Sequence, residues 1–179
     1  MNSPHYFLAR RPLRLLSAMM ILAVMSVTLQ VSIAQQAKLP ARIELEDQHE
    51  KKHVITFPAK TITVISLADR YGREEANQWA ASLAVYKNRA AIHGIADASG
   101  TPDIMKSMIR QHIQKAQPQE LLIDWTGATS TAMGRQPKVA NLIIVSRKGT
   151  VLHRIAGAPT PANVRAFTAA MDQALARIK

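Results

Sequence analysis

The stretch Thr61-Ile-Thr-Val-Ile-Ser-Leu67, followed by Ala68-Asp-Arg-Tyr-Gly72, decides the fold. Its first seven residues are β-branched or apolar with little alternation, which predicts a strand buried on both faces of a sheet. A helix is predicted over residues 73–86, because apolar side chains recur there at helical spacing, at Ala76, Trp79, Ala80, Leu83 and Tyr86. Glu74 and Glu75 lie in its first turn, where the helix dipole favours negative charge. The stretch therefore predicts a central strand, a loop and a helix.

The residues downstream continue this alternation of strand and helix. Residues 90–96 and 120–124 are apolar runs that predict two further strands. Between them, Thr101 supplies an N-cap and Pro102 a proline at the first helical position. We interpret the apolar positions of this helix as one core-facing side, with the methionines packed in the core rather than forming an adaptable binding groove: Ile104, Met105, Met108, Ile109, His112 and Ile113.

Two predicted hairpins flank this central unit. Residues 42–46 and 53–57 alternate in polarity on either side of a turn, and residues 139–145 and 150–155 are joined by a short glycine-containing turn. Two helices complete the order: a short piece at 128–133, and a last helix that begins at Thr160-Pro161 and faces inward with Val164, Phe167, Met171, Ala174, Leu175 and Ile178. The order predicts one α/β domain whose mixed sheet is partly parallel.

The amino-terminal segment has the three parts of a secretory signal peptide. Three arginines precede an uncharged stretch at residues 15–29, and small residues precede a cleavage site after Ala34. We therefore predict a signal peptide at residues 1–34, a polar leader at 35–40 and one domain at 41–179.

This division predicts a mature protein in a bacterial periplasm. The pair Arg10-Arg11 also resembles a twin-arginine export signal. The alternative is that residues 15–34 stay uncleaved and anchor the chain to the inner membrane as an accessory subunit, since the uncharged stretch approaches the length of a membrane span.

Composition and charge exclude several classes of function. The chain has 23 Lys and Arg against 12 Asp and Glu, and removal of residues 1–34 would leave 20 basic residues. A basic surface favours acidic proteins or anionic lipid headgroups, so we expect another envelope protein, acidic in character, as partner. Membrane contact is expected only if the amino-terminal segment stays uncleaved. Aromatic residues make up 4% of the chain, which argues against a base-stacking nucleic-acid binder.

The chain contains no cysteine. Disulfides, thiolate metal sites, iron–sulfur clusters and cysteine nucleophiles are thereby excluded. The histidines show no metal-ligand spacing, so structural or surface roles are predicted for them, and neither a metal nor a cofactor is expected. Asp97 and Asp124 each follow a strand and are predicted to cap turns, while Trp125 is predicted to pack beside the turn at Gly127.

The order of these segments resembles the thioredoxin-like superfamily, in particular its peroxiredoxin-type branch of thiol-specific antioxidant proteins. The resemblance covers about residues 41–178. It rests on the amino-terminal hairpin, the strand-loop-helix at 61–86, Leu121-Leu-Ile-Asp-Trp-Thr-Gly127, and Leu142-Ile-Ile-Val-Ser-Arg-Lys-Gly-Thr-Val-Leu152. It implies a three-layer sandwich: an α/β fold with a mixed sheet and an amino-terminal β-hairpin extension.

The resemblance also implies where the chemistry of the family would lie. A thioredoxin carries two cysteines at the start of the first helix, and this chain has Tyr71-Gly-Arg-Glu74 there. The family keeps a cis-proline opposite that loop, and this chain has Asn141 at that place, since Pro137 comes four residues too early. Thiol-disulfide oxidoreductase and cysteine peroxidase activities are therefore excluded for the isolated chain.

These considerations define one candidate site with two interpretations. The first is a redox-inactive binding module, assisting the assembly or folding of an envelope protein. The alternative is a small-anion site or a non-thiol enzyme, in which the helix amino terminus and the guanidinium groups bind a carboxylate or phosphate and Glu74 or Asp69 acts as base. The candidate residues are Asp69, Arg70, Tyr71, Gly72, Arg73, Glu74 and Asn141.

Overall fold

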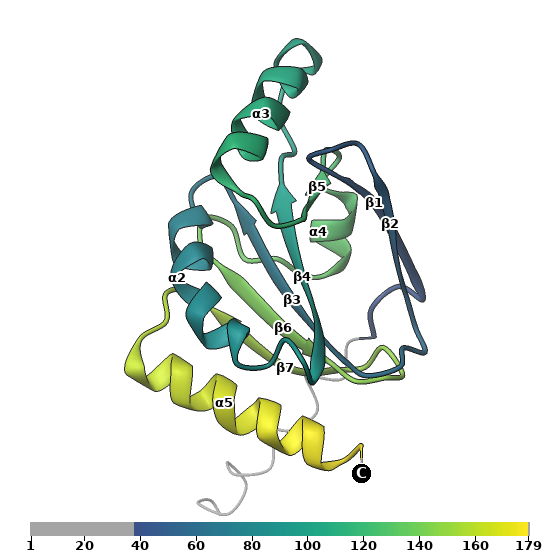
Figure 1. The fold of residues 1–179 in the computed structure, drawn as a ribbon, viewed down its shortest axis with the longest axis vertical. Helices are drawn as coiled ribbons and strands as arrows, with labels where there is room; N and C mark the ends of the chain where they lie inside the picture. The colour runs from purple at the N-terminus through teal and green to yellow at the C-terminus, as the bar shows by residue number, and fades with distance from the viewer. Residues whose placement is uncertain (1–37, 179) are drawn as a thin grey trace, which may run out of the picture. The chain divides into compact units, whose positions relative to one another are not determined.

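The computed structural model describes residues 38–178, so the predicted signal peptide, and the leader as far as residue 37, lie outside the described residues. The chain forms a mixed sheet covered by helices (Figure 1). Within residues 38–178, none of the helices combines the length and apolar character that a bilayer span requires. In chain order the elements are β1 (Arg42–Asp47), β2 (Lys52–Thr56), β3 (Ile62–Asp69), α2 (Arg73–Ala84), β4 (Ala90–Asp97), α3 (Asp103–Ala116), β5 (Leu121–Asp124), α4 (Ala128–Ala132), β6 (Asn141–Val145), β7 (Val151–Ala156) and α5 (Pro161–Ala176).

The sheet has seven strands in the order β2-β1-β5-β4-β3-β6-β7. Strands β3, β4 and β5 are parallel, while β6 and β7 add an antiparallel pair at one edge. The amino-terminal hairpin pairs β1 with β2 and joins the other edge by a short antiparallel contact between β1 and β5. The predicted mixed sheet with a hairpin extension is confirmed.

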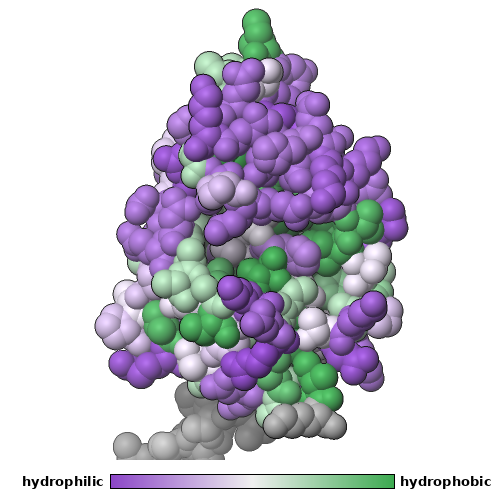
Figure 2. Space-filling model, in the orientation of Figure 1, coloured by the Kyte–Doolittle hydropathy of each residue, from purple (hydrophilic) through white to green (hydrophobic). Residues whose placement is uncertain are grey.

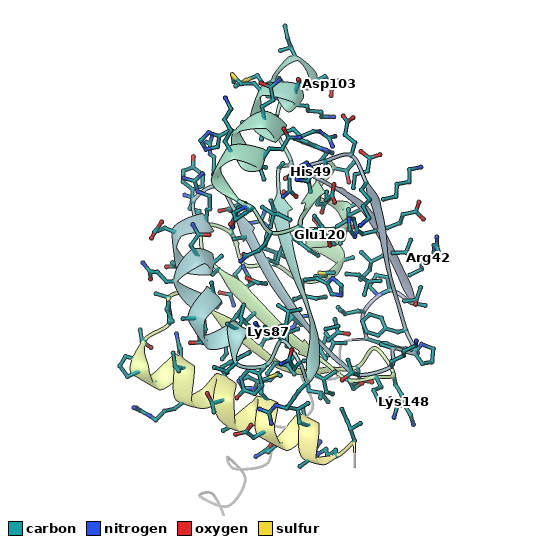
Figure 3. All side chains as sticks on the ribbon, in the orientation of Figure 1. Arg42, His49, Lys87, Asp103, Glu120 and Lys148 are labelled. Atoms are coloured by element: carbon teal, nitrogen blue, oxygen red, sulfur yellow. The ribbon has the colours of Figure 1, made fainter. Side chains whose placement is uncertain are left out.

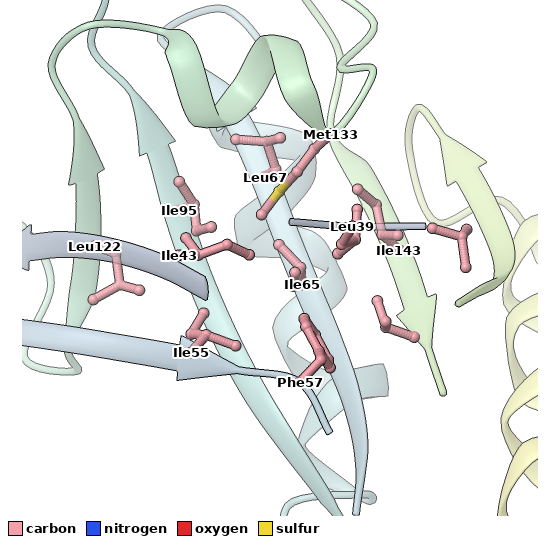
Figure 4. Packing of buried hydrophobic residues seen from close by; sticks show 12 residues of the cluster. Leu39, Ile43, Ile55, Phe57, Ile65, Leu67, Ile95, Leu122, Met133 and Ile143 are labelled. Carbon is pink, nitrogen blue, oxygen red and sulfur yellow. The ribbon is translucent and has the colours of Figure 1, made fainter. Parts of the chain in front are cut away.

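Two hydrophobic clusters hold helices and hairpin to opposite faces of the sheet. On one face, Trp79 of α2 and Phe167 of α5 pack edge to face, with ring centroids 5.6 Å apart. On the other face, Ile43 and Ile55 of the hairpin pack with Met133, at the end of α4, over the central strands (Figure 4). The inward faces predicted for α2 and α5 are confirmed, except that Ala80 is exposed. Sequence periodicity was sufficient here because both helices lie directly on the sheet.

The interpretation of α3 as a core-facing helix is wrong. No residue of α3 is buried, and the side chains of Ile104 and Met108 are 92% and 57% exposed. Met105 is also exposed, whereas Ile109 and Ile113 are only partly buried. The helix stands at one end of the sheet instead of across its face (Figure 1). Its apolar positions therefore meet little of the core.

Polar contacts hold α3 in this place. Arg110 donates to the backbone oxygen of Asp47 at 3.0 Å, and Gln114 donates to that of Gln48 at 2.6 Å. The guanidinium of Arg110 also lies 5.6 Å from the ring centre of Trp125, so Trp125 packs against α3 as well as following β5. A cationic side chain over an aromatic face is favourable. Hydrogen bonds and cation–π contacts replace the apolar packing that the sequence pattern predicts.

Buried Gln48 joins the hairpin turn to the end of α3. Its side-chain oxygen accepts from the N–H of Leu121 at 2.8 Å, and its nitrogen donates to the oxygen of Gln119 at 2.8 Å and to that of Gln117 at 3.3 Å. A fully buried amide satisfied in this way fixes the geometry of the groups around it. The segment between α3 and β5 is therefore held rigidly against the hairpin.

Candidate functional site

Asp69, the last residue of β3, shapes the loop that leads into α2. Its Oδ1 accepts from the backbone N–H groups of Tyr71 at 2.9 Å and Gly72 at 3.0 Å. Its Oδ2 accepts from the N–H of Lys138 at 2.8 Å and pairs with Arg135 at 2.8 Å. Aspartate commonly turns a chain by bonding to N–H groups that follow it. The carboxylate is committed to these four donors.

The electrostatics of Asp69 disfavour it as a general base. Burial by itself would raise the pKa of Asp69, but the N–H groups of Lys138, Gly72 and Tyr71 and the charge of Arg135 outweigh it and hold the pKa below its ordinary value. A general base works best with a pKa near the operating pH. Asp69 is therefore a positioning group of the loop.

Three aspartates end the three parallel strands side by side. Asp69 pairs in register with Asp97, and Asp97 with Asp124. Arg135 bridges the first two, its Nε lying 2.6 Å from an oxygen of Asp97. As predicted, Asp97 and Asp124 cap turns, because Asp97 accepts from the N–H of Ser99 and Asp124 accepts from the turn that opens α4. The carboxylates at the carboxyl ends of these three strands are therefore all hydrogen-bonded or ion-paired within the domain.

Gly72 brings the loop against the segment that precedes β6. A Cβ at this position would meet the carbonyl group of Val139 and lie 2.8 Å from the backbone nitrogen of Ala140. Glu75, in the first turn of α2, accepts from the N–H of Ala140 at 2.9 Å. The two segments are thus packed backbone to backbone and joined by a side-chain hydrogen bond.

Asn141 is buried beside this contact. Its Oδ1 accepts from the N–H of Gln136 at 2.8 Å, and its Nδ2 donates to the oxygens of Gln136 and Val139 at 2.9 Å each. The amide is engaged in shaping residues 136–141. The structure therefore places Asn141 near the loop, but its side chain is buried and is not accessible to a ligand or partner.

The remaining candidates form the exposed part of the loop. Tyr71 is 58% exposed, with the guanidinium of Arg70 4.5 Å and the ammonium of Lys138 6.0 Å from its ring centre. Arg73 is exposed and lies 3.3 Å from a ring nitrogen of His112 on α3, while Glu74 is exposed on the first turn of α2. The result is an aromatic ring flanked by cations, a surface suited to a protein contact or an anion.

Three groups of the site escaped sequence reasoning: Glu75, Arg135 and Lys138. The sequence marks Glu75 only as a favourable charge for the helix dipole, and nothing local marks it as the acceptor for the N–H of Ala140. Arg135 and Lys138 lie more than sixty residues from Asp69 along the chain. In the sequence, the only sign of their role is that two basic residues flank Gln136-Pro137, directly after the glycine that ends the predicted short helix.

A second cluster of charged residues lies at the hairpin turn. One ligand atom each from Asp47, His53 and Glu120 lies within 4.8 Å of the others, although the three are distant in sequence. Asp47 is 2.7 Å from Nε2 of His53 and Glu120 is 3.9 Å from Nδ1, so the carboxylates lie on opposite ring nitrogens. Lys51 also pairs with Glu120 at 3.1 Å (Figure 3 labels Glu120). Asp47, His53, Glu120 and Lys51 therefore form one connected polar network at the hairpin turn.

We expect stability to decline in acid because of Asp47. Burial would raise the pKa of Asp47, but hydrogen bonds from His53, His49 and Lys51 outweigh it and lower the pKa. A lowered folded-state pKa contributes stability that is present above the unfolded value, near 4, and is lost as the pH falls through the folded value. Urea unfolding between neutral pH and about pH 3 should therefore show a smaller pH dependence in Asp47→Asn than in wild type.

The matched control for this experiment is Asp172→Asn. Asp172 is exposed, and its oxygen is 4.0 Å from Arg89. This variant should keep the wild-type pH dependence, since exposed pairs contribute little. Equal pH dependence in Asp47→Asn and wild type would show that the Asp47 network does not favour the ionised carboxylate.

Solved structures share this arrangement of strands and helices. A thiol:disulfide interchange protein of the thioredoxin family from Chlorobium tepidum superposes with a TM-score of 0.56 at 14% identity, over 80% of this chain and 99% of that chain. The fold is thioredoxin-like. The exposed lipoprotein thioredoxin Etrx1 from Streptococcus pneumoniae gives 0.58 at 8% identity, over 74% and 99% of the two chains. A DsbF homologue from Corynebacterium diphtheriae gives 0.56 at 12% identity, over 77% and 87%.

No protein-family model and no curated protein matches the sequence. At these identities the solved structures establish the fold alone. The whole sequence contains no cysteine. The chain therefore has a thioredoxin-like fold but no thiol of its own that could exchange with a disulfide.

Proposed function

We propose that this chain is an exported, redox-inactive thioredoxin-like protein that acts by binding another envelope protein, as an accessory to its assembly or folding. The observation that carries the proposal is Tyr71. It lies on the loop where the resemblance places the redox cysteines, and it is exposed between the cations Arg70 and Lys138. Exposed aromatic and arginine side chains are the groups that most often dominate protein interfaces.

The rigidity of the loop supports this proposal. Asp69, Gly72 and Asn141 are engaged in internal contacts that fix the backbone on either side of Tyr71. A surface held in one conformation loses less entropy when a partner binds. Asp69, Gly72 and Asn141 are thus the support, and Arg70, Tyr71, Arg73 and Glu74 are the proposed contact residues.

The sequence supports the finer parts of the proposal. The signal-peptide pattern at residues 1–34 favours export to the periplasm, with anchoring by residues 15–34 as the alternative. The excess of Lys and Arg favours an acidic partner over nucleic acid. Within the superfamily, the segments quoted above resemble the peroxiredoxin-type branch, and the proposed protein would be a cysteine-free form of it.

A second candidate function is the binding of a small anion at the same loop. It is favoured by the three cationic side chains of Arg70, Arg73 and Lys138 around the amino terminus of α2. Anions bind readily where N–H groups and cations converge. As a non-thiol enzyme, such a site would have Glu74 as its base, since Asp69 is committed to four donors.

Co-purification from an envelope extract tests the proposal. The full chain should retain a specific protein, and Tyr71→Ala/Arg73→Ala should lose at least about nine-tenths of it, because two central contacts are removed. Mass spectrometry of the eluate measures the loss, and mass spectrometry of the purified chain gives its mature amino terminus.

Val85→Ala/Lys87→Ala is the matched control for that experiment. It removes an exposed apolar residue and a neighbouring exposed cation just beyond the other end of α2 (Figure 3 labels Lys87). It should retain the protein as wild type does. Equal retention by both double variants would contradict the proposal. A small anion that is retained by wild type and lost only from the Tyr71 variant would favour the second candidate.

A further inference from the structure

The exposed apolar side chains of α3 point to the chemistry of the partner. Ile104, Met105 and Met108 are exposed, and Ile104 and Met108 are one helical turn apart. Figure 2 shows a hydrophobic tip on the projection formed by α3, surrounded by hydrophilic surface. A cluster of exposed apolar side chains with a polar rim is typical of an interaction site.

This cluster is continuous with the Tyr71 loop. Residues 104, 108 and 112 follow one another at intervals of four, so they lie on one side of α3. His112 contacts Arg73, at the start of α2, at 3.3 Å. Farther along, Gln117 donates to Asn77 of α2 at 3.3 Å. We name the surface formed by Ile104, Met105, Met108, His112, Arg73 and Tyr71 the α3 ridge.

The opposite side of α3 is already occupied. Arg110 contacts Asp47 and Trp125, Gln114 contacts Gln48, and Lys106 pairs with Asp103 and lies over Trp125. The helix is therefore fixed to the domain by its polar and cationic side chains. The side that carries Ile104 and Met108 is turned outward by this arrangement, and its polar contact, between His112 and Arg73, joins it to the Tyr71 loop.

Cationic side chains gather at the Tyr71 end of the α3 ridge, where Arg70 and Lys138 flank the Tyr71 ring beside Arg73. Among residues 38–178, no carboxylate lies within 4 Å of the cationic groups of Arg70, Arg73, Lys115 or Lys138. A partner that carries carboxylates beside apolar anchors would gain from both features.

We propose that the α3 ridge binds an acidic protein segment whose apolar side chains cover Ile104 and Met108 while its carboxylates meet Arg73 and the neighbouring cations. This inference rests on the proposed function and names the partner's chemistry. A second copy of the chain would bring the same positive charge and be repelled. A lipid surface is disfavoured by Asp103, whose side chain is 93% exposed beside Ile104 and would enter the membrane with it.

Selection from a displayed library of random peptides, with the full chain as bait, tests this inference. Enriched peptides should combine several Asp or Glu with large apolar residues. The most enriched peptide, synthesised with a fluorescent label, should bind wild type in an anisotropy titration. Affinity should fall about tenfold or more in Ile104→Ser/Met108→Ser, because two anchors are removed. It should also fall as salt is raised, because the carboxylates are screened.

The matched control is Val54→Ser/Val85→Ser, which removes two exposed apolar side chains away from the α3 ridge. It should change affinity by less than about twofold. Neutral or basic enriched peptides, no enrichment, or unchanged affinity in Ile104→Ser/Met108→Ser would overturn the inference. The inference would also be overturned if the chain bound no peptide but did bind vesicles of anionic phospholipid, and if Ile104→Ser/Met108→Ser alone lost that vesicle binding.

The co-purification experiment separates failure of this inference from failure of the proposed function. If Tyr71→Ala/Arg73→Ala loses the envelope protein but Ile104→Ser/Met108→Ser retains it, the Tyr71 loop binds the protein and the apolar side chains of α3 do not. If neither variant loses any protein, both proposals fail.

Discussion

Gly72→Ala is expected to destabilise the fold by about 3 kcal/mol or more, the largest effect of any single methyl group added to the loop. The added Cβ would overlap the carbonyl group of Val139 and press on the nitrogen of Ala140. Backbone atoms cannot move aside as a flexible side chain can. The loop and the segment before β6 would have to separate, which would stretch the hydrogen bond from Ala140 to Glu75.

Urea denaturation followed by circular dichroism measures this effect, with Gly100→Ala as the control. Gly100 has a φ of +80°, but a Cβ there would meet no atom within 4 Å. Its substitution should cost only about 1 kcal/mol, from backbone strain. If both variants lose the same stability, the close approach at Gly72 does not constrain the fold. If Gly72→Ala remains folded but loses the envelope protein, the contact sets the position of Tyr71.

The sequence predicts most of the fold because most elements lie directly on the sheet. The β-branched run of β3 and the periodic faces of α2 and α5 each reflect one buried surface, so local pattern and tertiary structure agree. Element ends differ by a few residues, for example where α2 ends at Ala84 before a turn at Tyr86. Helix ends depend on local hydrogen bonds that periodicity does not describe.

Helix α3 shows where the pattern fails. Its apolar spacing resembles that of a core helix, yet Ile104 and Met108 are exposed because Arg110 and Gln114 attach the other side to the hairpin and Trp125. The hydrogen bonds to the hairpin join residues more than sixty positions apart. Apolar residues at helical spacing predict that one side of the helix is apolar. They do not indicate whether that side packs against the domain's own core or against a partner.

The candidate site was predictable in outline only. The loop at residues 69–74 follows from the strand and helix around it, and its exposed members are those with long polar or aromatic side chains. The division into exposed contacts and supporting residues depends on Arg135, Lys138 and Ala140, which reach the loop only through the folding of the sheet. Long-range hydrogen bonds of this kind leave no local spacing to recognise.

Asp69→Ala is expected to cost about 3 kcal/mol, the lower end of the range for removing one partner of a buried ion pair, because Asp69 and Arg135 are each partly buried. It would leave Arg135 with Asp97 alone and remove the acceptor for the N–H groups of Tyr71, Gly72 and Lys138. Asp69→Asn keeps an oxygen for the turn but loses the negative charge. It should cost about 1 to 2 kcal/mol, less than Asp69→Ala, because the turn keeps its acceptor and Arg135 keeps its contact with Asp97.

Urea denaturation of both variants, each also made with Arg135→Leu, separates the turn from the ion pair. A coupling energy of about 1 kcal/mol or more between Asp69→Asn and Arg135→Leu would show that the pair contributes beyond the turn. Equal losses in Asp69→Ala and Asp69→Asn would contradict the importance of the turn. Asp69→Asn should also keep the envelope protein in co-purification, because Tyr71 stays in place. Loss of that protein from a stably folded Asp69→Asn would instead mean that the carboxylate itself contacts the partner.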